Sequence, residues 1–446
     1  LRDLQNDSLR RLTQRENEFE FCPSFSRDGR SVVYTTWNDR TLGSIRIASV
    51  SKPNKNRPVT IRPGHYRSPV FSPDGKVVVF EKTSGGNLRS PLYSHDPGIY
   101  RTDVEGGQPE RISKDGSRPQ FAAGSERVFL QRSSSAKDAD NLALYSVDLD
   151  GHEERQHYTS KWATDYCISA DGSQIAFVER FNVYLAPFVN TGKPVELGPQ
   201  FEGLPVTKLS HQAGDWPHFS GDGKRLHWSL GPDLFTAELS EFTNTGPKNK
   251  TADSAAEESD SDKPSAASIH IGFKAKHTAP TGSFALVGGR IVTMGPSGVI
   301  ADGTIVVQQN RIVAVGRRDQ VTLPADARIL DISGQVVLPG FIDTHAHGAQ
   351  AAQGMVPQQN WVNYARLAFG VTTIHDPSNS THDIFAASEL TKAGLVTGPR
   401  TFSTGTILYG AGGSYKAEIE SLEDAKFHLK RMQAVGAFSV KSYNQP

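Results

Sequence analysis

The chain has 446 residues and carries 48 Lys and Arg against 48 Asp and Glu, so its formal net charge is zero. This balance gives no basic excess of the kind that nucleic acid attracts, and no apolar run is long enough to span a bilayer, so neither a nucleic-acid partner nor a membrane span is expected. The length suggests about three domains, and 41 Gly with 26 Pro suit short strands and tight turns.

A phrase that ends in Asp-Gly recurs through the first half of the chain, at intervals of roughly 50 residues. Its copies are residues 23–29, 69–75, 167–172 and 217–223, with a degenerate copy at 119–124. Asp followed by Gly favours a tight turn, because Gly accepts a positive φ and Asp bonds to its own turn. The repeated Asp residues are therefore interpreted as structural and not as ligands.

Each turn precedes a β-rich run, and each unit has room for four short strands, which is typical of propeller blades. These phrases resemble the repeats of TolB-type β-propellers over all five units. The stretch 8–13 reads as the closing strand of a further blade, so the sequence predicts a propeller of about six blades over residues 1–242. A propeller indicates a platform for binding a substrate or a protein partner and specifies no reaction.

Residues 243–282 form a predicted linker. Its first part, Thr243–Ser268, is too polar to be buried and is expected to be a mobile loop. A weak strand at Ile269–Phe273 could close the last blade. Residues 283–337 then hold short apolar runs with polar turns, which predict a small antiparallel sheet or sandwich module.

The stretch Pro339–Gly348 contains the most informative motif. In a strand, Asp343, His345 and His347 would share one face, and two imidazoles so spaced can bind one divalent metal. Two unrelated histidines are the alternative. The strand–helix alternation that follows favours the metal, with helices at about 357–369, 381–393 and from 421, and strands at 371–374, 400–403 and 437–441. A capping box is expected at Ser380/Asp383, and the helix that starts at Ser421 has Asp424 three residues on.

Such alternation builds a parallel sheet and, with eight units, a (β/α)8 barrel. Residues 338–446 hold about four units, so the sequence is expected to be a truncated reading of a longer protein. Lys441, at the end of the fourth strand, would point into the barrel. Its amine could form a carbamate that bridges two metals, or it could reach to solvent.

Residues 283–446 resemble the amidohydrolase superfamily, near its imidazolonepropionase-like and prolidase-like members, through residues 339–340, 343–347, 370–373 and 440–441. The resemblance implies that His345 and His347 bind the first metal and that Lys441 is the carbamylated bridge. Its remaining ligands and its proton-shuttling Asp have no counterpart, so no catalytic residue is assigned in this chain. His375, Asp376 and Asp343 are candidates for supporting roles, and the loop 409–413 for substrate contact.

The predicted fold is therefore multidomain: a propeller, a small β-sandwich module and the first half of an amidohydrolase barrel. The predicted function is metal-dependent hydrolysis of C–N bonds in an amide, a peptide-like substrate or a cyclic amide, with one or two zinc ions. The alternative is a non-catalytic scaffold with a degenerate barrel. A periplasmic or extracellular location is suspected, and the fragment alone is expected to be inactive.

Overall fold

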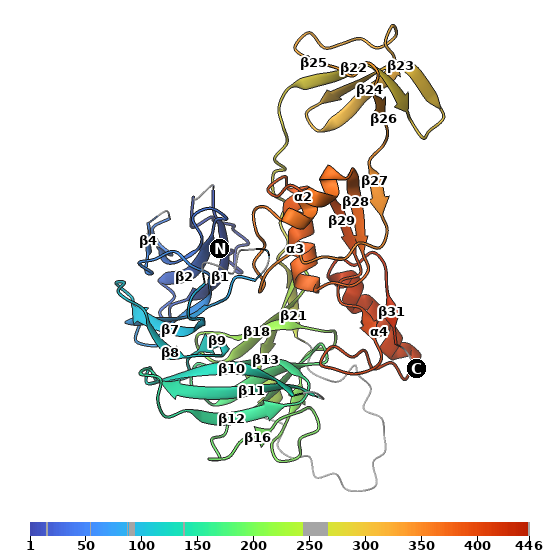
Figure 1. Ribbon diagram of the computed structural model, residues 1–446. Coiled ribbons are helices and arrows are strands. Elements are labelled where there is room, and N and C mark those ends of the chain that lie inside the picture. The colour runs from blue at the N-terminus through green and yellow to red at the C-terminus, as the bar shows by residue number, and fades with distance from the viewer. Residues whose placement is uncertain are drawn as a thin grey trace.

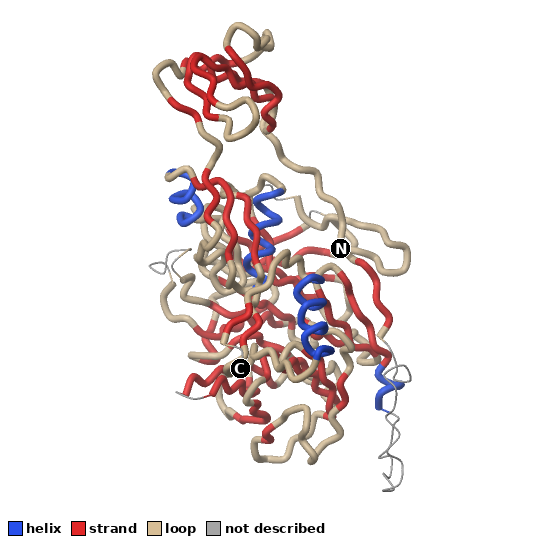
Figure 2. The backbone as a smooth tube through the Cα atoms, turned by 90° about the vertical axis from the view of Figure 1, so that its right-hand side faces the viewer, coloured by secondary structure: helices blue, strands red, loops and turns tan. Residues whose placement is uncertain are grey.

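The computed structural model describes residues 1–14, 17–53, 55–86, 88, 94–136, 139–243 and 266–444. Figure 1 shows a group of sheets built by the first half of the chain, an α/β unit beside it, and a small sheet at the top of the view. Strands dominate, and the helices other than a short one near residue 240 gather in the α/β unit (Figure 2). Within the described part, no helix has the length and apolar character needed to cross a membrane.

The first half of the described chain forms five sheets, each built mainly from consecutive antiparallel strands, with one parallel pair between β12 and β16. In chain order their strands are β1 (Phe19–Phe25), β2 (Ser31–Trp37), β3 (Ser44–Ser49) and β4 (Asn56–Pro58); β5 (Tyr66–Phe71), β6 (Val77–Lys82), β7 (Gly98–Asp103) and β8 (Glu110–Ser113); β9 (Ser117–Gln120), β10 (Arg127–Ala136), β11 (Ala139–Asp148) and β12 (Arg155–Ser160), extended by β16 (Val195–Glu196); β13 (Ala163–Ile168), β14 (Gln174–Glu179), β15 (Asn182–Pro187) and β17 (Thr207–Lys208); and β18 (Asp215–Phe219), β19 (Arg225–Leu230), β20 (Asp233–Glu238) and β21 (Ala267–His270).

The last sheet is completed across the predicted linker. β21 pairs antiparallel with β20, with His270 opposite Asp233, and α1 (Leu239–Thr243) precedes the gap. The strand expected at 269–273 thus begins two residues earlier. Most of the expected mobile loop, residues 244–265, lies outside the described residues. The closing strand expected at 8–13 contributes only an isolated bridge between Leu9 and Arg2, so a sixth blade stays a prediction.

The core of this region lies between the sheets. Each of four buried apolar clusters draws its residues from two successive sheets, and large side chains such as Phe80, Leu130, Phe177 and Trp228 are almost fully buried there. Burying such side chains on both faces of successive sheets is the main stabilising term. This face-to-face stacking of four-stranded sheets fits the predicted blades.

The Asp-Gly turns form as the sequence predicts. At the first turn Ser26 Oγ donates to Asp28 Oδ1 at 2.6 Å, and the N–H of Arg30 donates to the same oxygen at 3.0 Å, while Gly29 has a φ of +70°. The same Ser–Asp bond recurs at Asp74, Asp171 and Asp222. The hydroxyl bond is the main reason that the pKa of each of these carboxyls falls below its ordinary value. Their role as turn residues is confirmed.

A second repeated feature was not predicted. In four sheets the first strand, which lies at one edge, carries a bulge, and the residue before its Pro has a positive φ. These residues are Cys22, Ser68, Arg118 and Trp216, with φ between +48° and +59°. A side chain in this backbone region costs about 1–3 kcal/mol. Bulges of this kind turn a side chain out of the regular ladder, and Arg118 and Trp216 reappear below as the lining of a cavity.

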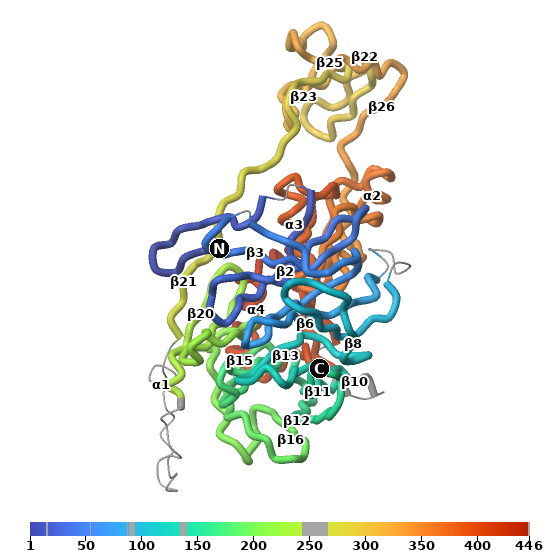
Figure 3. Tube along the Cα trace, turned by 90° about the vertical axis from the view of Figure 1, so that its left-hand side faces the viewer, coloured from blue at the N-terminus to red at the C-terminus, as the bar shows by residue number. Residues whose placement is uncertain are grey.

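The small sheet at the top of Figure 1 contains β22 (Ser283–Val292), β23 (Val299–Gln308), β24 (Arg311–Arg317), β25 (Arg328–Asp331) and β26 (Val336–Val337). Its order is β24-β23-β22-β25, and both β25 and β26 run parallel to β22. The expectation of an antiparallel arrangement is therefore wrong for these two strands, because residues 318–327 carry the chain back to the start of the sheet. Residues 271–282 lead to this sheet from β21 (Figure 3).

The α/β unit alternates as predicted. It contains β27 (Phe341–Asp343), α2 (Trp361–Ala368), β28 (Val371–Asp376), α3 (Thr381–Lys392), β29 (Arg400–Ser403), β30 (Leu408–Tyr409), α4 (Leu422–Ala434) and β31 (Ser442–Tyr443). β27, β28 and β29 form a parallel sheet, and β30 pairs parallel with β31. The expectation of a fourth strand at 437–441 is wrong. Within that segment the Phe438 ring contacts His375 and Phe402, and the strand forms only at β31.

Candidate functional site

The predicted metal residues follow β27, at the carboxyl edge of the parallel sheet. The strand ends at Asp343, four residues short of the His347 that the expected alternation includes, so His345 and His347 lie in the following loop. Gly340 lets this segment approach β28, since a Cβ there would overlap the Thr372 side chain. The carboxyl edge is where βα units place their active sites.

The loop is held on both sides of His345 by one residue of β28. The Nδ1 of His375 lies 3.2 Å from the carbonyl oxygen of Thr344, and the carbonyl of His375 accepts the N–H of Ala346 at 2.9 Å. The Nε2 of His375 is 2.6 Å from Ser439 Oγ. His375 thus connects the loop, β28 and the segment before β31, which is a supporting role.

The two predicted imidazoles lie side by side. The rings of His345 and His347 are 5.0 Å apart between centroids, at an interplanar angle of 72°. Two nitrogens bound to one tetrahedral zinc would lie about 3.3 Å apart, which this ring spacing allows. Asp343 accepts the backbone N–H of His345 at 3.0 Å, so its carboxylate shapes the turn.

Asp376, at the end of β28, is fully buried and anchors the site. Its Oδ1 lies 3.3 Å from Nδ1 of His347, and its Oδ2 accepts an N–H of Asn379 at 2.7 Å. Asn379 also donates to the carbonyl of Gly348 at 3.0 Å. A carboxylate on the far nitrogen of a ligating histidine fixes its tautomer and orientation, so Asp376 is placed to orient His347.

Arg366 of α2 secures the end of the same loop. Its Nη2 donates to the carbonyl of His347 at 2.7 Å and its Nη1 to Asn363 at 3.1 Å. Burial lowers the pKa of Arg366, against the opposing effect of Asp376 and Asp343. The loop that carries both histidines therefore has fixed contacts to α2, β28 and the start of α3.

Lys441 lies immediately before β31 and not at the end of a strand. Its Nζ is 5.2 Å from the centroid of the Tyr443 ring, and its carbonyl accepts the N–H of Leu408 at 3.0 Å.

The donor set fits a metal in part: two imidazoles are in contact, and Asp376 is bonded to one of them. Among the described residues, however, no three His, Cys, Asp or Glu side chains converge as a metal site.

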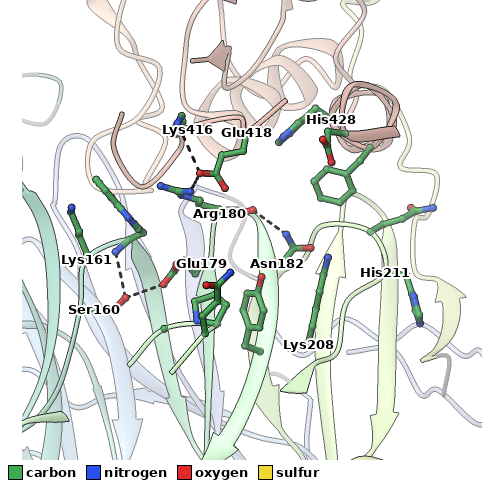
Figure 4. A pocket seen from close by; sticks show the side chains of 18 of the residues that line it. Ser160, Lys161, Glu179, Arg180, Asn182, Lys208, His211, Lys416, Glu418 and His428 are labelled. Carbon is green, nitrogen blue, oxygen red and sulfur yellow. Dashed lines mark hydrogen bonds and ion pairs between the residues drawn. The ribbon is translucent and has the colours of Figure 1, made fainter. Parts of the chain in front are cut away.

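A large hollow lies elsewhere, between the stacked sheets and the segment that leads into α4. This cavity, of about 1170 Å³, is lined by charged side chains (Figure 4). One ion pair crosses it, between Arg180 and Glu418, and Lys416, on the same segment as Glu418, lies 3.9 Å from that carboxylate. Glu179 accepts the Ser160 hydroxyl at 3.0 Å, and burial raises its pKa. The Arg180–Glu418 pair therefore links the stacked sheets to the segment before α4.

A smaller cavity, of about 340 Å³, lies on the same junction and includes the start of α3. Its lining joins the strained residues Arg118 and Trp216 to His382 and Arg431 of the α/β unit. The sequence pattern did not indicate it. The apolar spacing of α4 predicts a face of Leu422, Ala425, Leu429 and Met432. Of these Met432 is buried, but Leu422 and Leu429 are exposed, and His428 and Arg431 are the other buried side chains of the helix.

No family model matches the chain. Part of it is similar to the dihydroorotase of Anaeromyxobacter dehalogenans (strain 2CP-C), with 32% identity over 30% of this chain and 32% of that protein. Another similar protein is the imidazolonepropionase of Streptomyces griseus, with 29% identity over 32% of this chain and 37% of that protein. The chain spans about a third of the length of these curated relatives.

Among solved structures, a putative prolidase from Bifidobacterium longum has 24% identity, a TM-score of 0.31 and coverage of 36% of this chain and 40% of that one. TolB from Acinetobacter baumannii has 20% identity, a TM-score of 0.37 and coverage of 50% and 52%.

Proposed function

We propose that this protein is a metal-dependent hydrolase of C–N bonds in amides, peptide-like substrates or cyclic amides. The observation that carries the proposal is the contact of His345 and His347 at the carboxyl edge of a parallel sheet, 5.0 Å apart between ring centroids. The sequence similarity of part of the chain to a dihydroorotase and an imidazolonepropionase supports it. The substrate would be a small molecule or a peptide-like compound.

We further propose the domain division that the sequence suggests: a TolB-like propeller over 1–242, a connecting segment over 243–282, a composite β-module over 283–337 and half of a (β/α)8 barrel from 338. In this arrangement the propeller binds or admits the substrate, or holds a protein partner. The hydrolytic chemistry belongs to the α/β unit alone.

His345 and His347 would hold a divalent metal, of which zinc best suits imidazole ligands. When bound, such a metal lowers the pKa of water and polarises a carbonyl group. Asp376 keeps the His347 ring in one orientation, and His375 fixes the loop around His345. Lys441 would add an anionic oxygen ligand as a carbamate. Its amine must first lose its proton and leave the Tyr443 ring, and it would then add to CO2 and release a second proton to solvent.

Turnover by the full-length protein tests the proposal. The metal-stripped protein is assayed with dipeptides and cyclic amides, before and after zinc is restored. We expect zinc-dependent hydrolysis that falls at least about 100-fold in His345→Ala, while His152→Ala, in an exposed turn of the stacked sheets, keeps full activity. Lys441→Ala should reduce the bound zinc from two ions to one if the carbamate bridge forms. Hydrolysis that survives both chelation and His345→Ala would refute the proposal, and a complete lack of turnover would favour a scaffold.

A further inference from the structure

The guanidinium of Arg431 is buried at the junction without a carboxylate partner. The side chain is only 5% exposed and lines the smaller cavity. Within the described residues it forms no ion pair, and its Nε has no hydrogen-bond partner. A buried charge is costly unless an opposite charge or strong hydrogen bonds compensate it. The structure therefore leaves the positive charge of Arg431 without a compensating anion at this point.

The neighbours of Arg431 do not supply a compensating negative charge. Its Nη2 lies 3.4 Å from Nδ1 of His428, and its Cζ lies 3.6 Å from the Phe181 ring centroid. Burial lowers the pKa of His428 to about 4, so this imidazole is neutral near pH 7 and accepts a hydrogen bond without supplying charge. Phe181 offers only the face of its ring.

The two carboxylates that line the cavity are already paired. Asp165 forms an ion pair with Arg118, and Asp215 lies 3.2 Å from Nε2 of His382. Asp215 acts on Arg431 only at longer range, where its charge opposes the lowering of the Arg431 pKa by burial. When His382 is protonated, these pairs leave the charge of Arg431 on the cavity wall without a partner.

The start of α3 adds a second feature that favours an anion. Ser380, Thr381 and His382 line the cavity, and they are the N-cap and first turn of a twelve-residue helix. The sequence predicts a capping box there, but the Ser380 side chain makes no capping hydrogen bond. Ser380 therefore caps none of the N–H groups of this first turn, while Asp383 in the same turn supplies a carboxyl whose pKa burial raises. At α4, by contrast, the box of Ser421 and Asp424 is complete.

The remaining wall is aromatic. Trp216 lies at one of the strained bulges, with its ring 4.8 Å from the Arg118 guanidinium and 5.0 Å from the His382 ring. Phe181 and Tyr415 complete this wall. Flat apolar surfaces beside one guanidinium suit a ligand with a planar anionic group and an apolar body.

We propose that this cavity binds a small organic carboxylate, whose charged group meets the Arg431 guanidinium and the first turn of α3 while its apolar part packs on Trp216. The ligand would contact both the stacked sheets and the α/β unit, and would tighten their junction. This site is separate from the proposed metal residues, and it stands whether or not the protein is a hydrolase.

Calorimetric titration with benzoate and its neutral analogue benzamide tests the proposal. Benzoate should bind and raise the Tm, and benzamide should do neither. Arg431→Gln should weaken benzoate binding at least tenfold. Lys430→Gln, one residue away on the exposed side of α4, should bind as the unmodified protein does. The Tm of Arg431→Gln without ligand should be unchanged or higher, because the substitution removes an uncompensated buried charge.

A purely structural Arg431 predicts the opposite pattern. In that case Arg431→Gln would lower the Tm by several degrees and leave benzoate binding intact, or benzoate and benzamide would behave alike. If Arg431→Gln does not fold, Arg431→Lys, which keeps the charge but loses the planar fork, and Trp216→Leu should each weaken benzoate binding. Unchanged binding in both overturns the proposal. Phosphate binding in preference to benzoate would overturn the assignment to carboxylates.

Discussion

At the scale of single residues, the account depends on how a short loop holds two histidines. The spacing of His345 and His347 predicts that both face one metal, and their rings are indeed in contact. Strand alternation does not bring the two rings together, as the pattern suggests, because β27 ends before them. Contacts of Asp376 and His375 hold the loop that carries them. Neighbours of this kind come from β28, more than 25 residues along the chain, so local spacing cannot identify them.

Asp376→Asn tests the orienting role of that carboxylate. The substitution keeps the size of the side chain and one acceptor but removes the charge that faces Nδ1 of His347. Loss of such an outer partner typically weakens metal affinity about 10–100-fold. We expect a fall of this size in zinc affinity, measured by competition with a chromophoric chelator. Asp343→Asn, whose carboxylate accepts the backbone N–H of His345, should have a smaller effect, and equal effects would contradict the orienting role.

At the scale of elements, turns and helix ends are predicted well where the chemistry is local. The Asp-Gly turns and the box at Ser421 form because every partner lies within a few residues. The box expected at Ser380 fails where α3 meets the stacked sheets and the cavity. The buried face of α4 is misjudged for the same reason, since its partner Phe181 lies about 250 residues earlier in the chain.

Gly231 tests how closely the last sheet packs on α4. It lies in the turn between β19 and β20 with φ +56°, and an added Cβ would overlap the carbonyl group of Ala434. Gly231→Ala should therefore lower the free energy of unfolding by about 1 kcal/mol for the backbone, plus about 1–3 kcal/mol for the overlap. Gly223→Ala, at φ +69° with the nearest atom to an added Cβ 4.0 Å away, should lower the free energy of unfolding by the backbone contribution alone. Urea denaturation measures both losses. Equal losses would mean that the contact is not tight.

The pair of His382 and Asp215 makes the junction sensitive to pH. Burial alone would lower the pKa of His382, but the hydrogen bond and charge of Asp215 outweigh it and raise the pKa, with Asp383 adding to this and Arg118 opposing it. Stability from this pair is therefore fully present below about pH 6.5 and lost as the pH rises through the folded pKa. The contribution of this pair to the free energy of unfolding should stay below about 1 kcal/mol, because His382 is half exposed.

Thermal melts at pH 6 and pH 8.5 measure this dependence. The unmodified protein should lose more stability across the interval than His382→Gln does. His277→Gln, in the exposed segment before β22, should behave as the unmodified protein. A loss of the same size in His382→Gln would show that another group is responsible.

At the scale of the whole molecule, the periodic patterns give most of the architecture. The Asp-Gly repeat predicts the stacked sheets, and the strand–helix alternation predicts the α/β unit. The parallel strands of the small sheet and the junction cavities were not predicted, because they depend on contacts between segments that no repeat relates. The small sheet also exposes large side chains on β24 and β25, among them Ile312, Val313 and Ile329.

Zinc binding to the metal-stripped protein is the most direct test of the central claim. Isothermal titration, with the bound zinc counted by elemental analysis, should show at least one ion bound per chain. His345→Ala and His347→Ala should each abolish or severely weaken this binding, while His152→Ala should leave it unchanged. Equal zinc content and affinity in all four proteins would contradict the account, because the two imidazoles after β27 would then not be metal ligands.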